Sequence, residues 1–255
     1  MYVAGLTFKV KVEPQCCLSS VTMLVFTGHQ CLDLIFALSI LHWAKCSPST
    51  QQDELAPTEV QFHSLDFQNV LHWKHLQTGK NQKYFVQYKI YGEKAWSNAD
   101  HCQGIQSLKC DLTRETSDPR EWYYARVRSL SPEGFSSWIL SHRFYPQWES
   151  QFSPPKIKAT VAEQTITVQI IPPRTPMKGP KRRRIRVTKL QKLTFRIYLL
   201  HNDIEEEVHE TDSCSKKLEI RGLRPETTYC LQALSVTPRS GRQSSRSPRT
   251  CIRTH

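Results

Sequence analysis

Histidine pairs are the first candidates for chemistry in this sequence, because two histidines on one face of an element can bind zinc. His72 and His75 lie in a run rich in aromatic and β-branched residues, which is typical of a strand. In a strand, this spacing places the two side chains on opposite faces, so the pair is poorly placed to share a metal ion. His209-Glu210 lacks the second histidine of a metalloprotease helix. The sequence therefore predicts no metal site.

Motifs for phosphate binding and nucleophilic catalysis are also missing. The chain contains no Gly-rich phosphate loop and no Gly-x-Ser-x-Gly turn. Only 9 of its 255 residues are glycine, so tight turns that surround a phosphate are scarce. We therefore expect a protein that is not an enzyme and that has no cofactor.

One strongly basic run stands out in a basic chain, which has 35 Lys+Arg against 23 Asp+Glu and a formal net charge of +12. Such a balance is typical of a solvated basic surface, and it also accompanies binding to nucleic acid, anionic membranes or sulfated glycans. Composition alone does not choose among these. The candidate residues for binding heparan sulfate are Lys181, Arg182, Arg183, Arg184 and Arg186, with Lys189 and Lys192 nearby.

The cysteines after residue 46 predict disulfides in an oxidising compartment. These five are Cys102, Cys110, Cys214, Cys230 and Cys251, an odd number that allows at most two bridges. A separation of 8 residues suits a hairpin-closing bridge between Cys102 and Cys110, and one of 21 suits a bridge between distant strands, joining Cys230 to Cys251. Cys214 is then left free. Disulfides and secretion both conflict with a nuclear role, so we expect no nucleic-acid partner.

The N-terminal segment 1–46 reads as a signal peptide. Its apolar run 31–41 is shorter than the roughly 20 residues that span a bilayer, and Ala44-Lys45-Cys46 resembles a cleavage site. Asp33 interrupts the run and no strongly basic segment precedes it. If translation begins at Met23, residues 1–22 are an upstream extension. The alternative to a signal peptide is that the apolar run is a buried strand or helix of a cytosolic protein. No other stretch approaches transmembrane length, so we expect a secreted protein without a membrane anchor.

Beyond residue 55 the pattern is all-β, with short runs of aromatic and β-branched residues separated by turn formers. The same pattern of short strands and turns begins again after Pro154-Pro155, which predicts two tandem β-sandwich modules, 55–150 and 151–255. The expected strands are 60–65, 70–74, 84–91, 122–129 and 138–144 in the first module, and 157–161, 165–171, 193–200, 217–220, 228–236 and 250–254 in the second.

A tyrosine-corner motif identifies the type of sandwich. Residues 223–229 read Leu-Arg-Pro-Glu-Thr-Thr-Tyr, the fibronectin type III pattern at the entry to the sixth strand. In a tyrosine corner the ring packs in the core while the hydroxyl bonds to the backbone upstream. We expect Tyr229 to play this part in the second module and Tyr123 in the first.

Several segments then resemble the class II cytokine receptors. They are Tyr84–Gly92, Cys102 with Cys110–Thr113, Glu115–Asp118, Tyr123–Arg128, Phe135–Trp138, Arg143-Phe144, Trp148-Glu149, and Tyr229-Cys230 with Cys251. The resemblance covers about residues 51–255 and is densest up to residue 155. Residues 178–192, which contain the basic run, stand where the family carries a largely acidic and aromatic stretch.

The resemblance implies that loops at one end of each module bind a helical class II cytokine at the elbow between them, with interleukin-22 as the expected ligand. Tyr91 is the main candidate, because exposed tyrosine is enriched among binding hot spots; the alternative is that it packs on Trp96. The full set of expected contact residues is Tyr91, Gly92, Glu93, Glu115, Thr116, Ser131, Pro132, Thr237 and Pro238, with Thr175–Met177 as a further loop.

The function implied is that of a monomeric, secreted decoy, since a receptor without an anchor or cytoplasmic tail sequesters its ligand without signalling. A heparan-sulfate-binding matrix or adhesion module is the alternative function, and an anchored cofactor similar to tissue factor is a third.

Arg126 and Arg128 are expected on the same face of their strand, where their side chains either stack against Trp138 or remain solvated.

Overall fold

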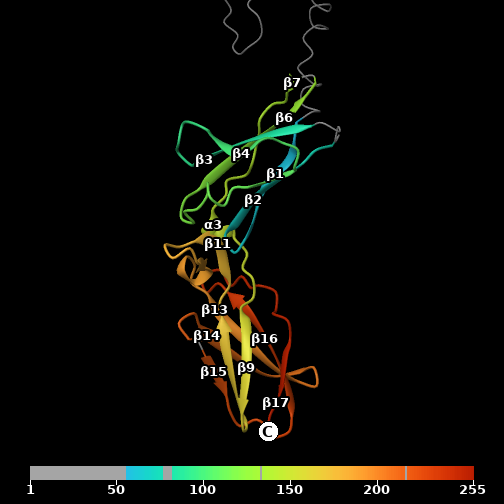
Figure 1. The fold of residues 1–255 in the computed structure, drawn as a ribbon, viewed down its shortest axis with the longest axis vertical. Coiled ribbons are helices and arrows are strands. Elements are labelled where there is room, and N and C mark those ends of the chain that lie inside the picture. The colour runs from blue at the N-terminus through green and yellow to red at the C-terminus, as the bar shows by residue number, and fades with distance from the viewer. Residues whose placement is uncertain (1–55, 77–81, 133, 216) are drawn as a thin grey trace, which may run out of the picture. The chain divides into compact units, whose positions relative to one another are not determined.

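The computed structural model describes residues 56–76, 82–132, 134–215 and 217–255, and the strands within these ranges form two β-sandwiches (Figure 1). The expected signal peptide lies outside the described residues. In the first sandwich, one sheet has the order β1 (Thr58–Leu65), β2 (Gln68–Lys74), β5 (Lys109–Asp111). The other has the order β4 (Ser97–Ile105), β3 (Lys83–Ile90), β6 (Tyr123–Ser131), β7 (Gly134–Phe135), and β8 (Ile139–Leu140) also pairs with β6.

The second sandwich repeats this arrangement. One sheet has the order β15 (Lys217–Ile220), β10 (Thr165–Ile171), β9 (Lys156–Ala162), and the other β14 (Ile204–Asp212), β13 (Thr194–His201), β16 (Thr228–Val236), β17 (Thr250–Arg253). A separate ribbon pairs β11 (Arg174–Lys178) with β12 (Arg184–Arg186). The described helices are α3 (Pro146–Glu149) and a 3-10 turn, Val187–Lys189. The all-β prediction is confirmed.

Alternating burial along the strands builds each core. In β6, Tyr123, Ala125 and Val127 are buried between the sheets, while Tyr124 and Arg126 on the other face are half-exposed. Removing apolar surface from water in this way is the main favourable term in folding.

Both modules contain a tyrosine corner. The Tyr123 hydroxyl donates to the Asp118 carbonyl at 3.1 Å, and the Arg224 N–H donates to the Tyr229 hydroxyl at 3.2 Å. Both rings are buried. Each contact fixes the loop that crosses from one sheet to the other at the start of the sixth strand.

Each module also contains one disulfide. Cys102–Cys110 joins the two sheets of the first module, from β4 to β5, and Cys230–Cys251 joins the neighbouring strands β16 and β17. Cys214 is free and exposed in the turn after β14. The pairing is the one expected from the sequence, but the expected geometry is wrong for both bridges. The first connects two sheets and does not close a hairpin, and the second joins adjacent strands and not distant ones.

Some strands differ from the prediction. Residues 138–144 hold only the short β8 and a bridge between Phe144 and Tyr123, because Trp138 turns to stack on arginines of β6. The sequence prediction missed β4 and β14, because the polar β4 and the acidic β14 lack a run of aromatic and β-branched residues. β14 is an edge strand exposed along most of its length, so the usual alternation does not apply to it. The expected loop Thr175–Met177 is part of β11, with Thr175 buried.

The linker packs against both modules. Phe67, in the turn between β1 and β2, is buried with Phe152 among core residues of the second module. The Asp66 carboxylate accepts hydrogen bonds from the Ser153 N–H at 2.9 Å and the Ser153 hydroxyl at 2.6 Å. The Ser235 hydroxyl donates to the Ser153 carbonyl at 2.8 Å. The linker is therefore held by specific contacts at each end.

Candidate functional site

Strand register decides which of the predicted contact residues lie together. β3 and β6 run antiparallel, with Ile90 opposite Tyr123 and Lys83 opposite Leu130. Tyr91 therefore lies at the end of the sheet where β6 begins, and Ser131 at the end where it finishes. β6 has 9 residues, so the two ends are separated by roughly 25 Å at about 3.3 Å per residue. The structure therefore does not bring Ser131 and Pro132 together with Tyr91, as the prediction had expected, because they lie at the opposite end of the sheet.

The turn after β3 presents Tyr91 to solvent, with 58% of the residue exposed. The Tyr91 N–H donates to the Trp122 carbonyl at 2.7 Å, which ties the turn to the start of β6. Gly92 follows with φ +91°, a conformation that side chains disfavour. The Glu93 carboxylate accepts from the Ile90 N–H at 3.2 Å, which closes the turn. Tyr91 does not use the expected alternative partner, since Trp96 stacks with Lys89 and Arg126 instead.

A cluster of aromatic rings and one arginine extends this surface. The rings of Trp122 and Tyr145 stack with centroids 4.4 Å apart, and the Arg143 guanidinium lies 4.0 Å from the Trp122 ring centre. The same guanidinium is 5.6 Å from the Tyr91 ring centre. We call Tyr91, Trp122, Arg143 and Tyr145 the aromatic surface. It lies at the linker end of the first module, because α3 begins at the next residue, Pro146.

The sequence prediction missed three of these four residues. Trp122 and Tyr124 flank the buried Tyr123 in the alternation of β6, so both had to point away from the core. That alternation was a usable signal for Trp122. Arg143 and Tyr145 gave no such signal, because only the bridge from Phe144 to Tyr123 brings them beside it.

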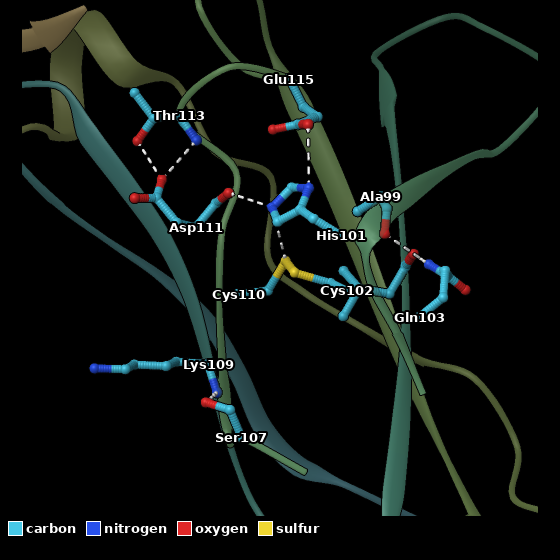
Figure 2. The surroundings of a disulfide bond; sticks show 11 residues. Ala99, His101, Cys102, Gln103, Ser107, Lys109, Cys110, Asp111, Thr113 and Glu115 are labelled. Carbon is cyan, nitrogen blue, oxygen red and sulfur yellow. Dashed lines mark hydrogen bonds and ion pairs between the residues drawn. A yellow bond between two sulfur atoms is a disulfide. The ribbon is translucent and has the colours of Figure 1, made fainter. Parts of the chain in front are cut away.

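Glu115 and Thr116 make contacts within the first module and are not exposed for contact with a ligand. Thr116 is buried, where its hydroxyl donates to the Leu112 carbonyl at 2.7 Å and accepts from the Asn69 amide at 2.8 Å. The Glu115 side chain is 13% exposed, and its carboxylate lies 3.6 Å from Nδ1 of His101 (Figure 2). Both residues are therefore removed from the predicted contact set.

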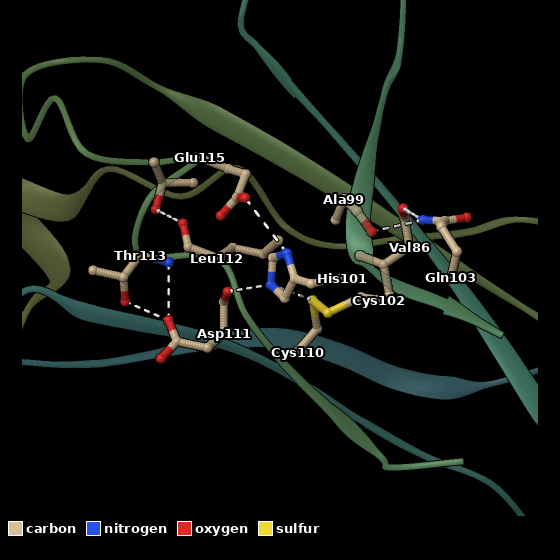
Figure 3. Close-up of polar contacts among 11 residues, drawn as sticks. Val86, Ala99, His101, Cys102, Gln103, Cys110, Asp111, Leu112, Thr113 and Glu115 are labelled. Atoms are coloured by element: carbon tan, nitrogen blue, oxygen red, sulfur yellow. Dashed lines mark hydrogen bonds and ion pairs between the residues drawn. A yellow bond between two sulfur atoms is a disulfide. The ribbon is translucent and has the colours of Figure 1, made fainter. Parts of the chain in front are cut away.

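His101 also lies beside the first disulfide, and Figure 3 shows it between Cys110 and the Asp111 carbonyl. Its Nε2 is 2.8 Å from that carbonyl and 3.9 Å from the Cys110 sulfur. The donor atoms of His101, Cys102 and Cys110 lie within 4.8 Å of one another. Both sulfurs are joined in the disulfide, so no thiolate is available to ligate a metal. The arrangement positions the Glu115 loop.

The second module brings the turn after β16 to the same region of the linker. Arg242 donates to the Ser150 carbonyl at 3.1 Å, and burial lowers the pKa of its guanidinium. Pro238 is exposed, as predicted for a contact residue. Thr237 is buried, with its hydroxyl 2.6 Å from that of Ser240, so it is corrected to a residue that shapes the turn.

A hollow of about 460 Å³ lies between the two modules beside the linker. Asp118 and Arg120 line it from the first module, and Lys189 and Leu190 from the second. Hydrogen bonds from the Arg120 side chain and N–H lower the pKa of Asp118. The linker region therefore offers an aromatic surface next to charged groups of both signs, which is suited to binding a protein.

Comparisons with known proteins agree with this architecture. The family model of tissue factor matches residues 33–138, and that of the interferon-alpha/beta receptor fibronectin type III domain matches residues 150–255. Interleukin-22 receptor subunit alpha-2 of Rattus norvegicus is 35% identical over 200 residues, which are 78% of this chain and 87% of the rat protein. The chain belongs to the class II cytokine receptor family.

Two further comparisons describe this class II cytokine receptor. The Homo sapiens protein named interleukin-22 receptor subunit alpha-2 is 30% identical over 251 residues, 85% of this chain and 95% of the human protein. The crystal structure of the chicken interferon gamma receptor alpha chain superposes with a TM-score of 0.62 at 18% identity, over 78% of this chain and 98% of that chain. Family and fold are those of binding proteins, so this receptor is not an enzyme, as predicted. None of the helices in the described ranges is long and apolar enough to cross a membrane.

Proposed function

We propose that this receptor is a secreted decoy that binds interleukin-22 at the linker ends of its two modules. The observation that carries the proposal is the aromatic surface, in which an exposed tyrosine adjoins a stacked Trp122–Arg143 pair. Tyrosine, tryptophan and arginine are the residue types enriched among binding hot spots. Pro238 and Glu93 complete the contact set from the predicted residues, one from each module.

The similarity to the alpha-2 chains supports interleukin-22 as the ligand, because it extends over most of both proteins at 30–35% identity. A decoy acts by mass action: it occupies the cytokine surface that a signalling receptor would otherwise contact. No catalytic step is needed. Loops on two rigid sandwiches are well suited to this task, since the scaffold holds them without further ordering on binding.

Substituting Tyr91→Ala tests the site. We expect the variant to bind interleukin-22 at least about 2 kcal/mol more weakly, roughly thirtyfold in Kd, because a central aromatic anchor is lost. Its melting temperature should stay close to that of the parent, since Tyr91 contributes little buried area. Surface plasmon resonance on the purified protein measures the affinity, and other helical cytokines of the class measure selectivity.

Phe135→Ala is the matched control. Phe135 is also an exposed aromatic residue, at 39%, but it lies in β7 at the opposite end of the same sheet. Its removal should leave cytokine binding unchanged. Loss of binding in Phe135→Ala with retention in Tyr91→Ala would place the site at the far end of the module. A parent protein that binds no helical cytokine would overturn the receptor-decoy proposal itself.

A further inference from the structure

The basic run of the sequence folds into a hairpin that lies outside the contact set proposed above for the cytokine. β11 pairs antiparallel with β12, and we call residues 174–186 the basic hairpin. The Gly179 N–H donates to the Arg183 carbonyl at 2.9 Å, which closes the turn. Arg174 donates from its side chain to the Arg184 carbonyl at 2.8 Å, which fastens the two strands. The basic residues are therefore held on an ordered element.

Like charges face each other across this hairpin. The register places Arg174 opposite Arg186 and Lys178 opposite Arg184. Directly opposed like charges destabilise an antiparallel pair. Arg182, in the turn, has φ +55°, a conformation in which glycine or asparagine is favoured. An anionic ligand placed between these side chains would offset the repulsion of the opposed charges.

No acidic residue compensates this charge locally. Asp and Glu are absent from the sequence between Glu163 and Asp203. Elsewhere in the second module arginines are paired with carboxylates, as in Arg221–Glu219 and Arg253–Glu226. Within the described part of the chain, the basic side chains of the hairpin take part in no such ion pair. The net positive charge is thus concentrated where no carboxylate of the described residues forms an ion pair with it.

The hairpin also has a shape that can hold a ligand. A hollow of about 510 Å³ lies against it. Its lining is mostly basic and includes Arg174, Lys181, Arg183, Arg184, Arg186 and Lys189. Guanidinium groups match planar and tetrahedral oxyanions with paired N–H donors. A polyanionic chain can therefore contact several of these residues at once.

We propose that the basic hairpin is a binding site for a sulfated glycan chain of the heparin type. Residues 174–189 contain no aromatic side chain on which a nucleic-acid base could stack. None of the exposed large apolar side chains of the described ranges lies in this segment, so it lacks an anchor for a membrane surface. The two disulfides indicate the oxidising compartments where sulfated glycans occur.

The test compares two triple variants of the full chain on immobilised heparin. Arg183→Gln/Arg184→Gln/Arg186→Gln removes three unpaired hairpin charges, and Arg221→Gln/Arg249→Gln/Arg253→Gln removes three paired charges elsewhere in the module. We expect the hairpin variant to bind roughly tenfold more weakly, with a slope of log affinity against log salt reduced by about two to three. The control variant should stay within about twofold of the parent. Equal losses of heparin affinity in the two variants would show that only the net charge matters, and would overturn the proposal of a binding site at the hairpin.

Two further measurements need no variant, so they remain decisive if the hairpin variant fails to fold. Bound heparin should protect Lys178 and Lys181 from acetylation, read by mass spectrometry, while the exposed Lys156 and Lys217 stay reactive. Unprotected Lys178 and Lys181 would overturn the proposal. Fully desulfated heparin and single-stranded DNA should compete poorly at equal concentration of charge. Competition by either one as strong as by heparin would overturn the assignment to a sulfated glycan.

Discussion

At the scale of single residues, the two tyrosine corners use the same hydroxyl in different ways. Tyr123 donates to a carbonyl, whereas Tyr229 accepts from a backbone N–H. Burial raises the pKa of Tyr123 to about 12, because the tyrosinate would lose its hydration inside the sandwich. The neutral phenol is therefore the form that the fold requires.

Tyr123→Phe should cost about 1 kcal/mol in the free energy of unfolding at neutral pH, since the hydrogen bond to Asp118 is lost. A group whose pKa is raised on folding stabilises the folded state at pH values below its unfolded pKa, which is 10.0 for tyrosine. This contribution is lost as the pH rises through the folded pKa, which is about 12 for Tyr123. The stability difference between parent and Tyr123→Phe should therefore narrow above about pH 10. Urea denaturation at several pH values measures it, and a difference that widens with pH would contradict the burial of the phenol.

At the scale of elements, stacked arginines and aromatic rings cover the outer face of the β3–β6 sheet. The Arg126 guanidinium lies 4.3 Å from the Trp96 ring centre and 4.5 Å from that of Trp138. The Arg128 guanidinium lies 4.5 Å from Trp138 and 3.9 Å from Phe135. Burial, and secondarily the charge of Arg128, lower the pKa of Arg126. The two arginines are therefore stacked and not merely solvated.

Trp138→Ala should cost about 1–3 kcal/mol in the free energy of unfolding, because it removes the ring shared by both arginines and leaves their charges unshielded. The loss should shrink as salt screens the repulsion. Trp148→Ala is the control: Trp148 is 55% exposed, and its removal should change stability by less than about 0.5 kcal/mol. Equal effects of the two substitutions, measured by urea denaturation, would show that the stack contributes nothing specific.

At the scale of the whole molecule, one residue of the first module belongs to the core of the second. Asp66 and Phe67 form the turn between β1 and β2 with φ values of 53° and 64°. Two-residue hairpin turns of this kind favour asparagine and glycine, so phenylalanine is a costly choice here. The Phe67 ring is 1% exposed and packs with Phe152, which offsets that cost and couples the modules.

Phe67→Ala should uncouple the two modules. We expect one calorimetric transition for the parent and two for the variant, with a total loss of about 3–5 kcal/mol from the vacated space. Phe195→Ala is the control, since Phe195 is equally buried but lies within the second module. Phe195→Ala should destabilise the protein by a similar amount. It should still melt in one transition, because the contacts of Phe67 and Asp66 that couple the modules remain. A variant Phe67→Ala that still melts in one transition would mean that the linker alone couples the modules.

Features encoded locally along the chain could be predicted from the sequence. Alternation in β6 predicted its buried face, the motif around Tyr229 predicted the corner, and cysteine spacing predicted the pairs that the structure contains. Such signals arise because burial and turn geometry act on neighbouring residues. The two-sandwich fold followed from them, and the family followed from the resemblance carried by segments such as Tyr84–Gly92.

Which loops lie together could not be predicted from the sequence, because it depends on the register between strands far apart in sequence. The tertiary structure separated Ser131 from Tyr91, buried Thr116 and Thr237, and brought Arg143 beside Trp122. It also set Arg174 opposite Arg186, which turned a run of charge into a defined surface. Alternation along one strand carries no information on these pairings. The positions of Ser131 and Arg143 depend on how distant strands pair, and the Arg174–Arg186 pair depends on the register of the β11–β12 hairpin.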